Sequence, residues 1–523
     1  MKKLFSLLLC AALLLTAAVP AGAEDRSDAD GFKAFVATDI HHFVTDEVPK
    51  VDGEYVYFNN LGLTPTLAPA LLAEFLRQAA ESDADYVFLT GDLADTPDVA
   101  QAKAVAKVLA RFEKRSGKQV FVINGNHDTN YTGDTSSAAM TVKRFKKIYA
   151  RFGYDEALCI DRRTCSYTAD LKNGYRLIAI DALDRPGNGG GTITPALADW
   201  ITAQADQAKK DGKQLVALMH HPLMNHFTQM SRLLPLFVIS NSEEACRLFA
   251  QCGIQLVFTG HFHQNDAAVY HGARDVYDVE TTSLSCYPNA YRTAEFHTDA
   301  VDIRTVMIET IDTSALPAGY TEAQKARIAA DLPGYASDCL KSDSVAKVKS
   351  YLNAEKIAGR LGTTNPLVIK LIGKAISAVS DGFDLPLYGE NGSIEAFAKP
   401  FGLTLPQTEY ATLNDAAAAF IAAQLAGDEN FDSGSPLVRV LLFGAIAMLC
   451  RQAAKPLEGQ SSVITQRLRQ LVVWAGSLLG RLQTHRWLTD LLLLPLDPLL
   501  VGLTVDRAPE DNNIELSFSQ SKS

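Results

Sequence analysis

An α/β domain followed by a mainly α-helical region is the fold class that the sequence predicts. Over residues 31–315, apolar runs rich in β-formers alternate with stretches of helical periodicity, which is typical of an α/β domain. From residue 316 to residue 523, Pro and Gly punctuate segments rich in Ala, Leu, Lys and Gln, which favour helices. The chain has 523 residues, too many for one compact core, so two folded parts are expected.

The α/β part begins with a regular alternation of strands and helices. Strands are predicted at 32–38, 86–90 and 119–123, with helices at 66–81 and 100–115 between them. Two later runs, 165–171 and 175–183, flank Asn173-Gly174 and predict a hairpin, because these residues readily take the positive φ of a tight turn. Further apolar strands are predicted at 214–219 and 254–259.

The C-terminal part contains predicted helices at 321–331, 415–425 and 462–482. Its most apolar stretches, 440–450, 471–479 and 491–505, are shorter than a membrane span requires, which favours buried helices of a bundle. Contact of these helices with a membrane surface or the cell envelope is the alternative. The last residues, 508–523, are expected to form a polar tail.

The first residues have the layout of a secretory signal peptide. Lys2 and Lys3 precede an apolar stretch over 4–19, and the small residues Ala21-Gly22-Ala23 follow it. This pattern predicts a signal peptide over residues 1–23 and a secreted or extracytoplasmic protein. In an oxidising compartment cysteines can pair, and Cys159 and Cys165, which flank a charged turn, are the best candidates for a disulfide.

The charge balance narrows the classes of partner. The chain carries 49 Lys and Arg against 60 Asp and Glu, a formal net charge of −11. A surface this acidic repels phosphate backbones, which argues against a dedicated nucleic-acid binder. It remains compatible with a small phosphorylated substrate.

Five clusters of metal-ligating residue types follow predicted strands. They are Asp39-Ile40-His41, Gly91-Asp92, Gly125-Asn126-His127-Asp128, His220-His221-Pro222 and Gly260-His261-Phe262-His263. The carboxyl ends of strands in α/β sheets share one rim, where ligands bind, so these side chains are expected to meet. Imidazole and carboxylate without thiolate suit borderline ions such as Mn, Fe, Zn or Co.

In this order, the five motifs resemble the calcineurin-like metallophosphoesterase family over residues 32–310. The resemblance implies a four-layer αββα sandwich with a two-metal site at its rim. It implies one metal held by Asp39, His41, Asp92 and His263, and a second held by Asp92, Asn126, His220 and His261. His127 matches the catalytic histidine of the family, and either Asp95 or Asp128 would fix its tautomer. The neighbouring His42 and His221 are not expected to be ligands.

The resemblance also implies an activity, the hydrolysis of a phosphodiester or phosphomonoester by in-line attack of a hydroxide that bridges two divalent or trivalent ions. Two alternatives are a metal-binding but non-catalytic exported interaction module and a nuclease of the same fold. The presence of His127 beside all seven ligands favours the hydrolase. Metal identity, natural substrate and oligomeric state do not follow from the sequence. Substrate contacts are expected from the loops at 43–63, 130–141, 185–194 and 225–240.

Overall fold

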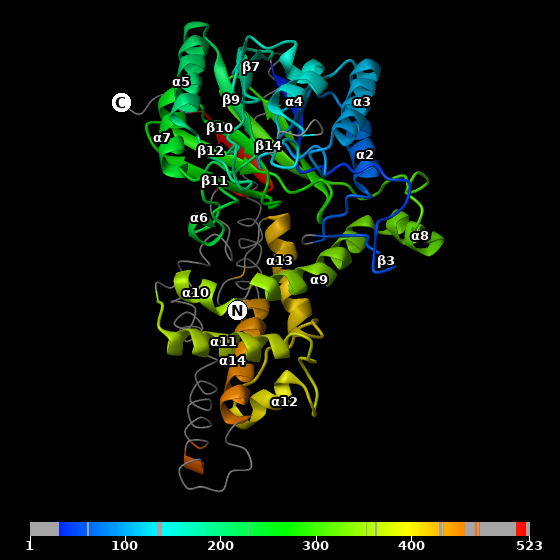
Figure 1. Ribbon diagram of the computed structural model, residues 1–523, viewed down its shortest axis with the longest axis vertical. Helices are drawn as coiled ribbons and strands as arrows, with labels where there is room; N and C mark the ends of the chain where they lie inside the picture. Colours follow the sequence, from blue (N-terminus) through cyan, green and yellow to red (C-terminus); the bar gives the residue numbers. More distant parts are fainter. Residues whose placement is uncertain are drawn as a thin grey trace, which may run out of the picture.

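The computed structural model describes residues 31–59, 62–132, 139–228, 230–351, 353–360, 363–427, 431, 434–455, 466–467, 470 and 509–518. Two β-sheets lie face to face with helices outside each, and a separate group of helices lies at one end of this sandwich (Figure 1). The predicted signal peptide at 1–23 and the apolar stretches at 471–479 and 491–505 lie outside the described residues.

The first sheet has six strands in the order β15-β14-β13-β1-β4-β5. Their bounds are β1 Phe32–Ala37, β4 Tyr86–Leu89, β5 Gln119–Val122, β13 Ala290–Phe296, β14 Ala300–Met307 and β15 Asn513–Ser517. Strands β1, β4 and β5 run parallel, whereas β13, β14 and β15 are joined antiparallel. The three parallel strands therefore end at one edge of the sheet.

The second sheet has seven strands in the order β11-β12-β10-β9-β8-β7-β6. Their bounds are β6 Cys159–Ile160, β7 Tyr167–Asp170, β8 Tyr175–Ile180, β9 Gln214–Met219, β10 Leu256–Thr259, β11 Asp266–His271 and β12 Asp275–Glu280. Strands β8, β9, β10 and β12 are parallel. The predicted hairpin joins β7 to β8, and Asn173 at its turn has a φ of 55°. A small hairpin, β2 Lys50–Val51 and β3 Glu54–Tyr55, lies outside both sheets.

Each sheet is buried on both of its faces. On β9, Leu215, Ala217 and Met219 belong to the apolar cluster formed with the helices α5 (Pro195–Lys210) and α7 (Ser242–Cys252). The alternate residues Val216 and Leu218 belong to the core shared with the first sheet. Helices α2 (Ala68–Glu81) and α3 (Val99–Ser116) contribute to that core from the opposite outer face. This arrangement confirms the expected four-layer αββα sandwich.

Shorter helices and the C-terminal helices complete the chain. They are α4 Val142–Ile148, η1 Ala150–Tyr154, α6 Met230–Leu233, α8 Glu322–Ala330, α9 Leu332–Tyr351, α10 Ala354–Arg360, α11 Pro366–Gly382, α12 Ile394–Ala398, η2 Lys399–Phe401, α13 Leu413–Ala426 and α14 Pro436–Ala454. The helices predicted at 321–331 and 415–425 are confirmed. The one predicted at 462–482 falls almost wholly outside the described residues. The boundary at residue 315 stays a prediction.

The C-terminal helices enclose an apolar cluster of their own. Leu387 before α12, Leu413 on α13, and Val440 and Phe443 on α14 are buried in it. Within the described residues, α14 is the one helix long and apolar enough to cross a membrane, with a mean hydropathy of 1.6, and 44% of that stretch is buried.

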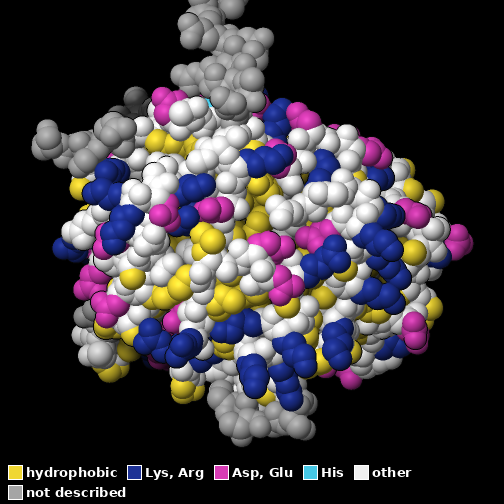
Figure 2. Space-filling view, turned by 90° about the horizontal axis from the view of Figure 1, so that it is seen from above, with side chains coloured by type: hydrophobic (Ala, Val, Ile, Leu, Met, Phe, Trp, Pro, Cys, Tyr) yellow, Lys and Arg dark blue, Asp and Glu magenta, His cyan; other side chains and the backbone are white. Residues whose placement is uncertain are grey.

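The opposite end of the molecule, formed by the sandwich, carries Lys and Arg interleaved with Asp and Glu (Figure 2).

Two expectations about local structure are wrong. The polar tail contains β15, whose Ile514 and Leu516 are buried while the residues between and beside them are exposed. This alternation over five residues is a strand pattern, too short to stand out in a polar segment. Cys159 and Cys165 are both free thiols, one half-buried on an edge strand and the other fully buried. Close spacing in sequence did not bring their side chains together, because spacing does not set direction.

Candidate metal centre

All five predicted clusters lie where parallel strands end, and the structure brings their metal-ligating side chains to one place. Asp39 and His41 follow β1, Asp92 follows β4, and Asn126 and His127 follow β5 in the first sheet. Across the sandwich, His220 follows β9, and His261 and His263 follow β10. The rim predicted from the strand pattern is therefore shared by both sheets.

The backbone at this rim is strained. Of the eight non-glycine residues with positive φ in the described chain, five are predicted ligands: Asp39, His41, Asp92, His261 and His263, with φ between 46° and 74°. Such conformations cost about 1–3 kcal/mol each and persist only where the surroundings impose them. These strained conformations lower the stability of the fold, and they point the five side chains inward.

Two glycines allow the close approach of the loops. A Cβ on Gly125 would collide with the Asp92 carboxylate, and one on Gly260 would collide with Thr38 and the Asp39 carboxylate. Only glycine therefore fits directly before Asn126 and directly before His261, because any Cβ there would clash with the neighbouring loop. Any larger residue at either position would push two ligand-bearing loops apart.

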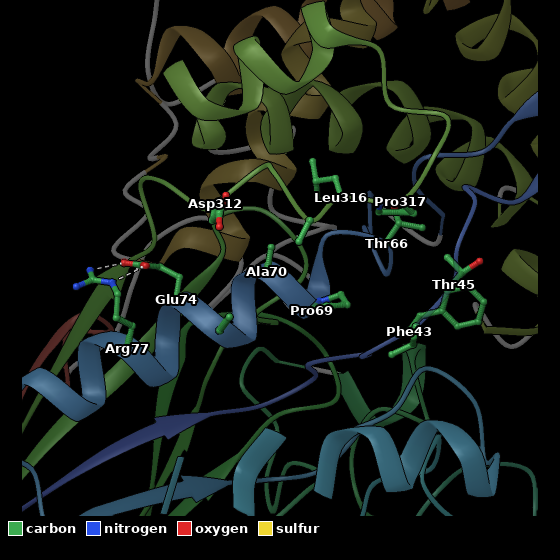
Figure 3. A pocket seen from close by; sticks show the side chains of 13 residues that line it. Phe43, Thr45, Thr66, Pro69, Ala70, Glu74, Arg77, Asp312, Leu316 and Pro317 are labelled. Atoms are coloured by element: carbon green, nitrogen blue, oxygen red, sulfur yellow. Dashed lines mark hydrogen bonds and ion pairs between the residues drawn. The ribbon is translucent and has the colours of Figure 1, made fainter. Parts of the chain in front are cut away.

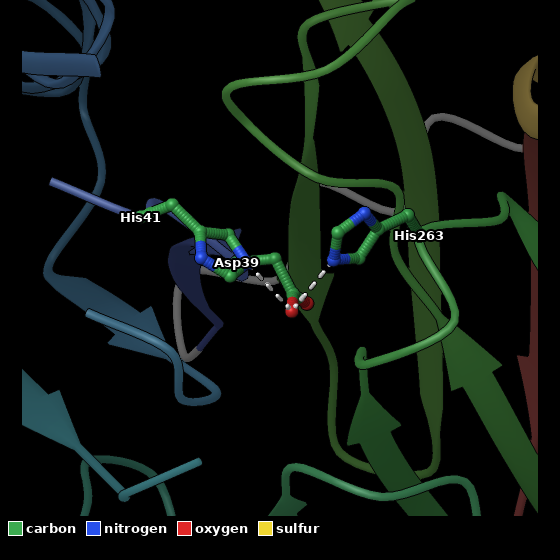
Figure 4. A group of neighbouring side chains, drawn as sticks. All are labelled: Asp39, His41 and His263. Carbon is green, nitrogen blue, oxygen red and sulfur yellow. Dashed lines mark hydrogen bonds and ion pairs between the residues drawn. The ribbon is translucent and has the colours of Figure 1, made fainter. Parts of the chain in front are cut away.

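Asp39, His41 and His263 form the first potential ligand group (Figure 4). Nε2 of His263 is 3.1 Å from Oδ1 of Asp39, and Nε2 of His41 is 3.7 Å from the same oxygen. The second carboxylate oxygen of Asp39 accepts hydrogen bonds from the Thr38 hydroxyl and the main-chain N–H of His261. One oxygen is thus held by the protein, and the other faces the two imidazoles.

Asp92, His220 and His261 form a second potential group, and Asn126 adjoins it. Nε2 of His220 is 3.3 Å from Oδ2 of Asp92 and 3.1 Å from Oδ1 of Asn126. Nδ1 of His220 donates to the carbonyl of Thr90, which leaves Nε2 available as a ligand. Nε2 of His261 donates to the carbonyl of Leu236, which leaves its Nδ1 available.

The two groups adjoin through His41 and Asp92. Nε2 of His41 is 3.8 Å from Oδ2 of Asp92, and a third potential group joins these two residues to His127. Both ring nitrogens of His41 are buried without a hydrogen-bond partner. A buried imidazole between two carboxylates and without a hydrogen bond fits a metal ligand, so the residues present fit an ion on each side of Asp92.

His127 lies beside the seven proposed ligands, and two hydrogen bonds hold it in place. Its main-chain N–H donates to Oδ1 of Asp92, and its Nδ1 donates to the main-chain carbonyl of Asp95. The tautomer is therefore set by the backbone of Asp95, while the Asp95 carboxylate lies 3.3 Å from Nδ1 of His41. The Asp128 carboxylate instead accepts three main-chain hydrogen bonds, from Leu93, Ala94 and Gly125.

His42 and His221 are both buried behind the centre. Burial, and for His221 also the charge of His220, lowers the pKa of each to about 4. Nε2 of His221 donates to the carbonyl of Gly189, and its ring lies 4.3 Å from that of His261. Neither His42 nor His221 belongs to a potential ligand group among the described residues, and their exclusion as ligands stays a prediction.

A supporting network was missed by sequence reasoning. The carboxylate of Glu280 accepts the main-chain N–H of Phe262, between two predicted ligands. Glu280 also lies 3.7 Å from Nε2 of His226, whose Nδ1 is 2.6 Å from Asp266. Asp266 and Glu280 stand at the ends of β11 and β12, His226 lies between β9 and α6, and the pairing of β12 with β10 was not predicted. Knowing that pairing would have pointed to them.

A hollow lies between α2 and the segment 312–317 (Figure 3). It has a volume of about 330 Å³, and its walls are mostly apolar, with Phe43, Ala70 and Leu316 among them. Phe43 and Thr66 also line a smaller hollow of about 110 Å³ that reaches Asp95. The two hollows share these side chains, and Asp95, whose carboxylate lies 3.3 Å from Nδ1 of His41, lines the smaller one.

The charges of the centre predict that metal binding releases protons. Burial alone would lower the pKa of His41 and His220, but the carboxylates around them raise it to about 10 and about 9, respectively. Both rings are therefore protonated at pH 7 in the metal-free protein, and both must be neutral to ligate an ion. The apparent metal affinity should rise with pH up to about pH 9–10.

The measurement is calorimetric titration of the metal-free protein with Mn²⁺ at pH 7 in buffers of different ionisation enthalpy. We expect about two protons released per protein. Binding without proton release would contradict the assignment of His41 and His220 as ligands.

The chain is similar in sequence and in fold to known proteins that act on phosphate esters. A cAMP/cGMP dual specificity phosphodiesterase of Mycobacterium tuberculosis is 24% identical over 220 residues, which cover 41% of this chain and 59% of that protein. The chain thus spans about three fifths of the length of this relative. Among solved structures, a dimetal phosphatase from Danio rerio has a TM-score of 0.38 and 11% identity, and the match covers 53% of this chain and 96% of that one. A purple acid phosphatase from yellow lupin, Lupinus luteus, has a TM-score of 0.35 and 12% identity, and the match covers 53% of this chain and 51% of that one. Residues 32–265 match the family described as calcineurin-like phosphoesterase, and this part of the chain is a domain of that family.

Proposed function

We propose that the protein is a metal-dependent hydrolase of phosphate esters that uses two ions and acts outside the cytoplasm. The observation that carries this proposal is the pair of ligand groups on either side of Asp92, with His127 directly beside them. A site with one carboxylate between two sets of imidazoles suits two cations that both contact the same phosphate group. Phosphodiesters are favoured, because the relative from Mycobacterium tuberculosis is named as a phosphodiesterase.

The residues of the chain have separable tasks in this reaction. When bound, the two ions supply Lewis acidity toward the phosphoryl oxygens and a hydroxide at neutral pH. Asp39, His41 and His263 would hold one ion, and His220, His261 and Asn126 the other, with Asp92 between them. His127 holds its Nδ1 proton against the Asp95 carbonyl, so Nε2 of the imidazolium form is the atom that would give a proton to the departing alkoxide.

Hydrolysis of bis(p-nitrophenyl) phosphate and p-nitrophenyl phosphate by the Mn²⁺-loaded protein tests the activity. We expect Asp92→Ala to lose turnover, since it removes the residue common to both ions, and His127→Ala to lose about 10²–10⁴-fold in kcat through the lost proton donor. His271→Ala, at an exposed histidine outside the centre, is the control. A metal-loaded protein inactive on both esters and on cyclic nucleotides would favour the non-catalytic binding module.

Export is the second part of the proposal, and it rests on the signal-peptide pattern of residues 1–23. We expect the mature protein, recovered from the medium or the envelope fraction of an expressing cell, to begin at Glu24. N-terminal sequencing measures this. A full-length chain that stays in the cytoplasm would refute export and leave the hydrolase unaffected.

We further propose that the hollow along α2 receives an apolar alcohol portion of the ester. Each methylene buried there is worth about 0.8 kcal/mol, so two of them would change binding by roughly tenfold. We expect p-nitrophenyl octyl phosphate to have a KM at least roughly tenfold below that of p-nitrophenyl methyl phosphate. Ala73→Trp, which fills the hollow, should abolish that preference, whereas Ala80→Trp, exposed on the same helix but outside the hollow, should keep it. Equal KM values for both esters in the wild type would exclude this role.

A further inference from the structure

The loop that carries His261 and His263 is held from outside the sandwich. Asn265, two residues beyond His263, is fully buried. Its main-chain N–H donates to the carbonyl of Leu425, 3.2 Å away, and its Nδ2 lies 3.5 Å from the carbonyl of Ala426. Leu425 and Ala426 are the last residues of α13, so the carbonyls left free at the end of a helix are satisfied by the metal-site loop.

The same asparagine is linked back to the predicted ligand. Oδ1 of Asn265 accepts the main-chain N–H of Thr282 at 3.1 Å, and Oγ1 of Thr282 donates to the carbonyl of His263 at 2.7 Å. A short hydrogen-bonded path therefore runs from the end of α13 through Asn265 and Thr282 to His263. His263 has a φ of 65°, a conformation that a histidine keeps only under restraint from its surroundings.

A second segment from the end of the chain reinforces this contact. Oδ1 of Asp511 accepts the main-chain N–H of Ala267 at 3.0 Å, and Nδ2 of Asn512 donates to the carbonyl of Ala426 at 3.0 Å. Gly427, directly after α13, has a φ of 77°, and a Cβ there would lie 2.8 Å from the carbonyl oxygen of Asn265 and 2.8 Å from Cβ of Asp511. The three segments are packed too closely for any side chain at residue 427.

Apolar packing fixes the C-terminal helices in this position. Leu63, Cys286, Leu340, Ala422 and Leu425 form one buried cluster. The cluster joins loops of the sandwich to α9 and α13, and Gly62 approaches the backbone of Leu340 so closely that a Cβ would lie 2.5 Å from its Cα. The contact between the two parts is therefore an extended, close-packed interface.

We infer that the C-terminal part of the chain is a positioning element of the metal centre: the end of α13 orients His263 through Asn265 and Thr282. The inference rests on the proposed metal site, because it assigns His263 as a ligand. Contacts that orient a ligand from behind typically change metal affinity by about 10–100-fold when they are lost. The C-terminal part would thus set the affinity of the ion bound by Asp39, His41 and His263.

Gly427→Ala in the full-length protein tests the inference. The added methyl group presses on the Asn265 carbonyl, and we expect the Mn²⁺ affinity of one of two sites, measured calorimetrically, to fall about 10–100-fold. Gly392→Ala is the matched control, since Gly392 lies in the same C-terminal part, has a φ of 74° and has nothing within 4 Å of its Cβ position. Thermal unfolding of the metal-free variants separates a loss of metal affinity from a loss of folding.

A double-mutant cycle shows whether the effect follows the proposed path. Thr282→Val removes the hydrogen bond to the His263 carbonyl, so combining it with Gly427→Ala should weaken metal binding by less than the product of the single effects. If Gly427→Ala does not fold, Asn265→Ala takes its place in the cycle. Unchanged affinity in Gly427→Ala or Asn265→Ala, or independent effects of the two changes, would overturn the inference. Wild-type protein that binds no metal would overturn the metal centre itself.

Discussion

The burial of two carboxylates, Asp39 and Asp92, beside the one imidazole of His41 is the constraint on which the rest of the centre depends. Both side chains are almost fully buried, and desolvation alone would push a carboxylate toward its neutral form. The surrounding histidines instead lower the pKa of both groups, so the carboxylates remain charged. Positive charge must therefore be present, either as protons on His41 and His220 or as metal ions.

The rim that holds these carboxylates is assembled from several loops with strained backbone. Parallel strands from two sheets deliver ligands to the rim, but a straight strand end would not point them at a common centre. The positive φ at five of the proposed ligands turns their side chains inward, and the glycines before Asn126 and His261 let the loops meet. The sandwich core supplies the stability that these conformations cost.

The sequence predicted well which side chains meet at the rim, because each of them follows an apolar strand and strand ends share a rim. The seven proposed ligands and His127 are brought together for that reason. It predicted poorly whatever depends on non-local pairing. The supporting roles of Glu280 and Asn265 need the pairing of β10 with β12 and the packing of α13, neither of which has a local signal. The contact of His127 with the Asp95 carbonyl is a backbone contact, which residue types alone do not reveal.

The strand β15 shows the same limitation at the scale of the fold. Its short alternating pattern did not distinguish it from a polar tail. It nevertheless pairs with β14, and the residues before it place Asp511 beside Ala267 and Asn512 beside the end of α13. The loop after His263 is thus held from two sides, by Thr282 of the sandwich and by the end of α13. The helices beyond the sandwich contact the same loop that carries two of the proposed ligands, and for this reason we infer that they help to shape the metal centre rather than form an independent appendage.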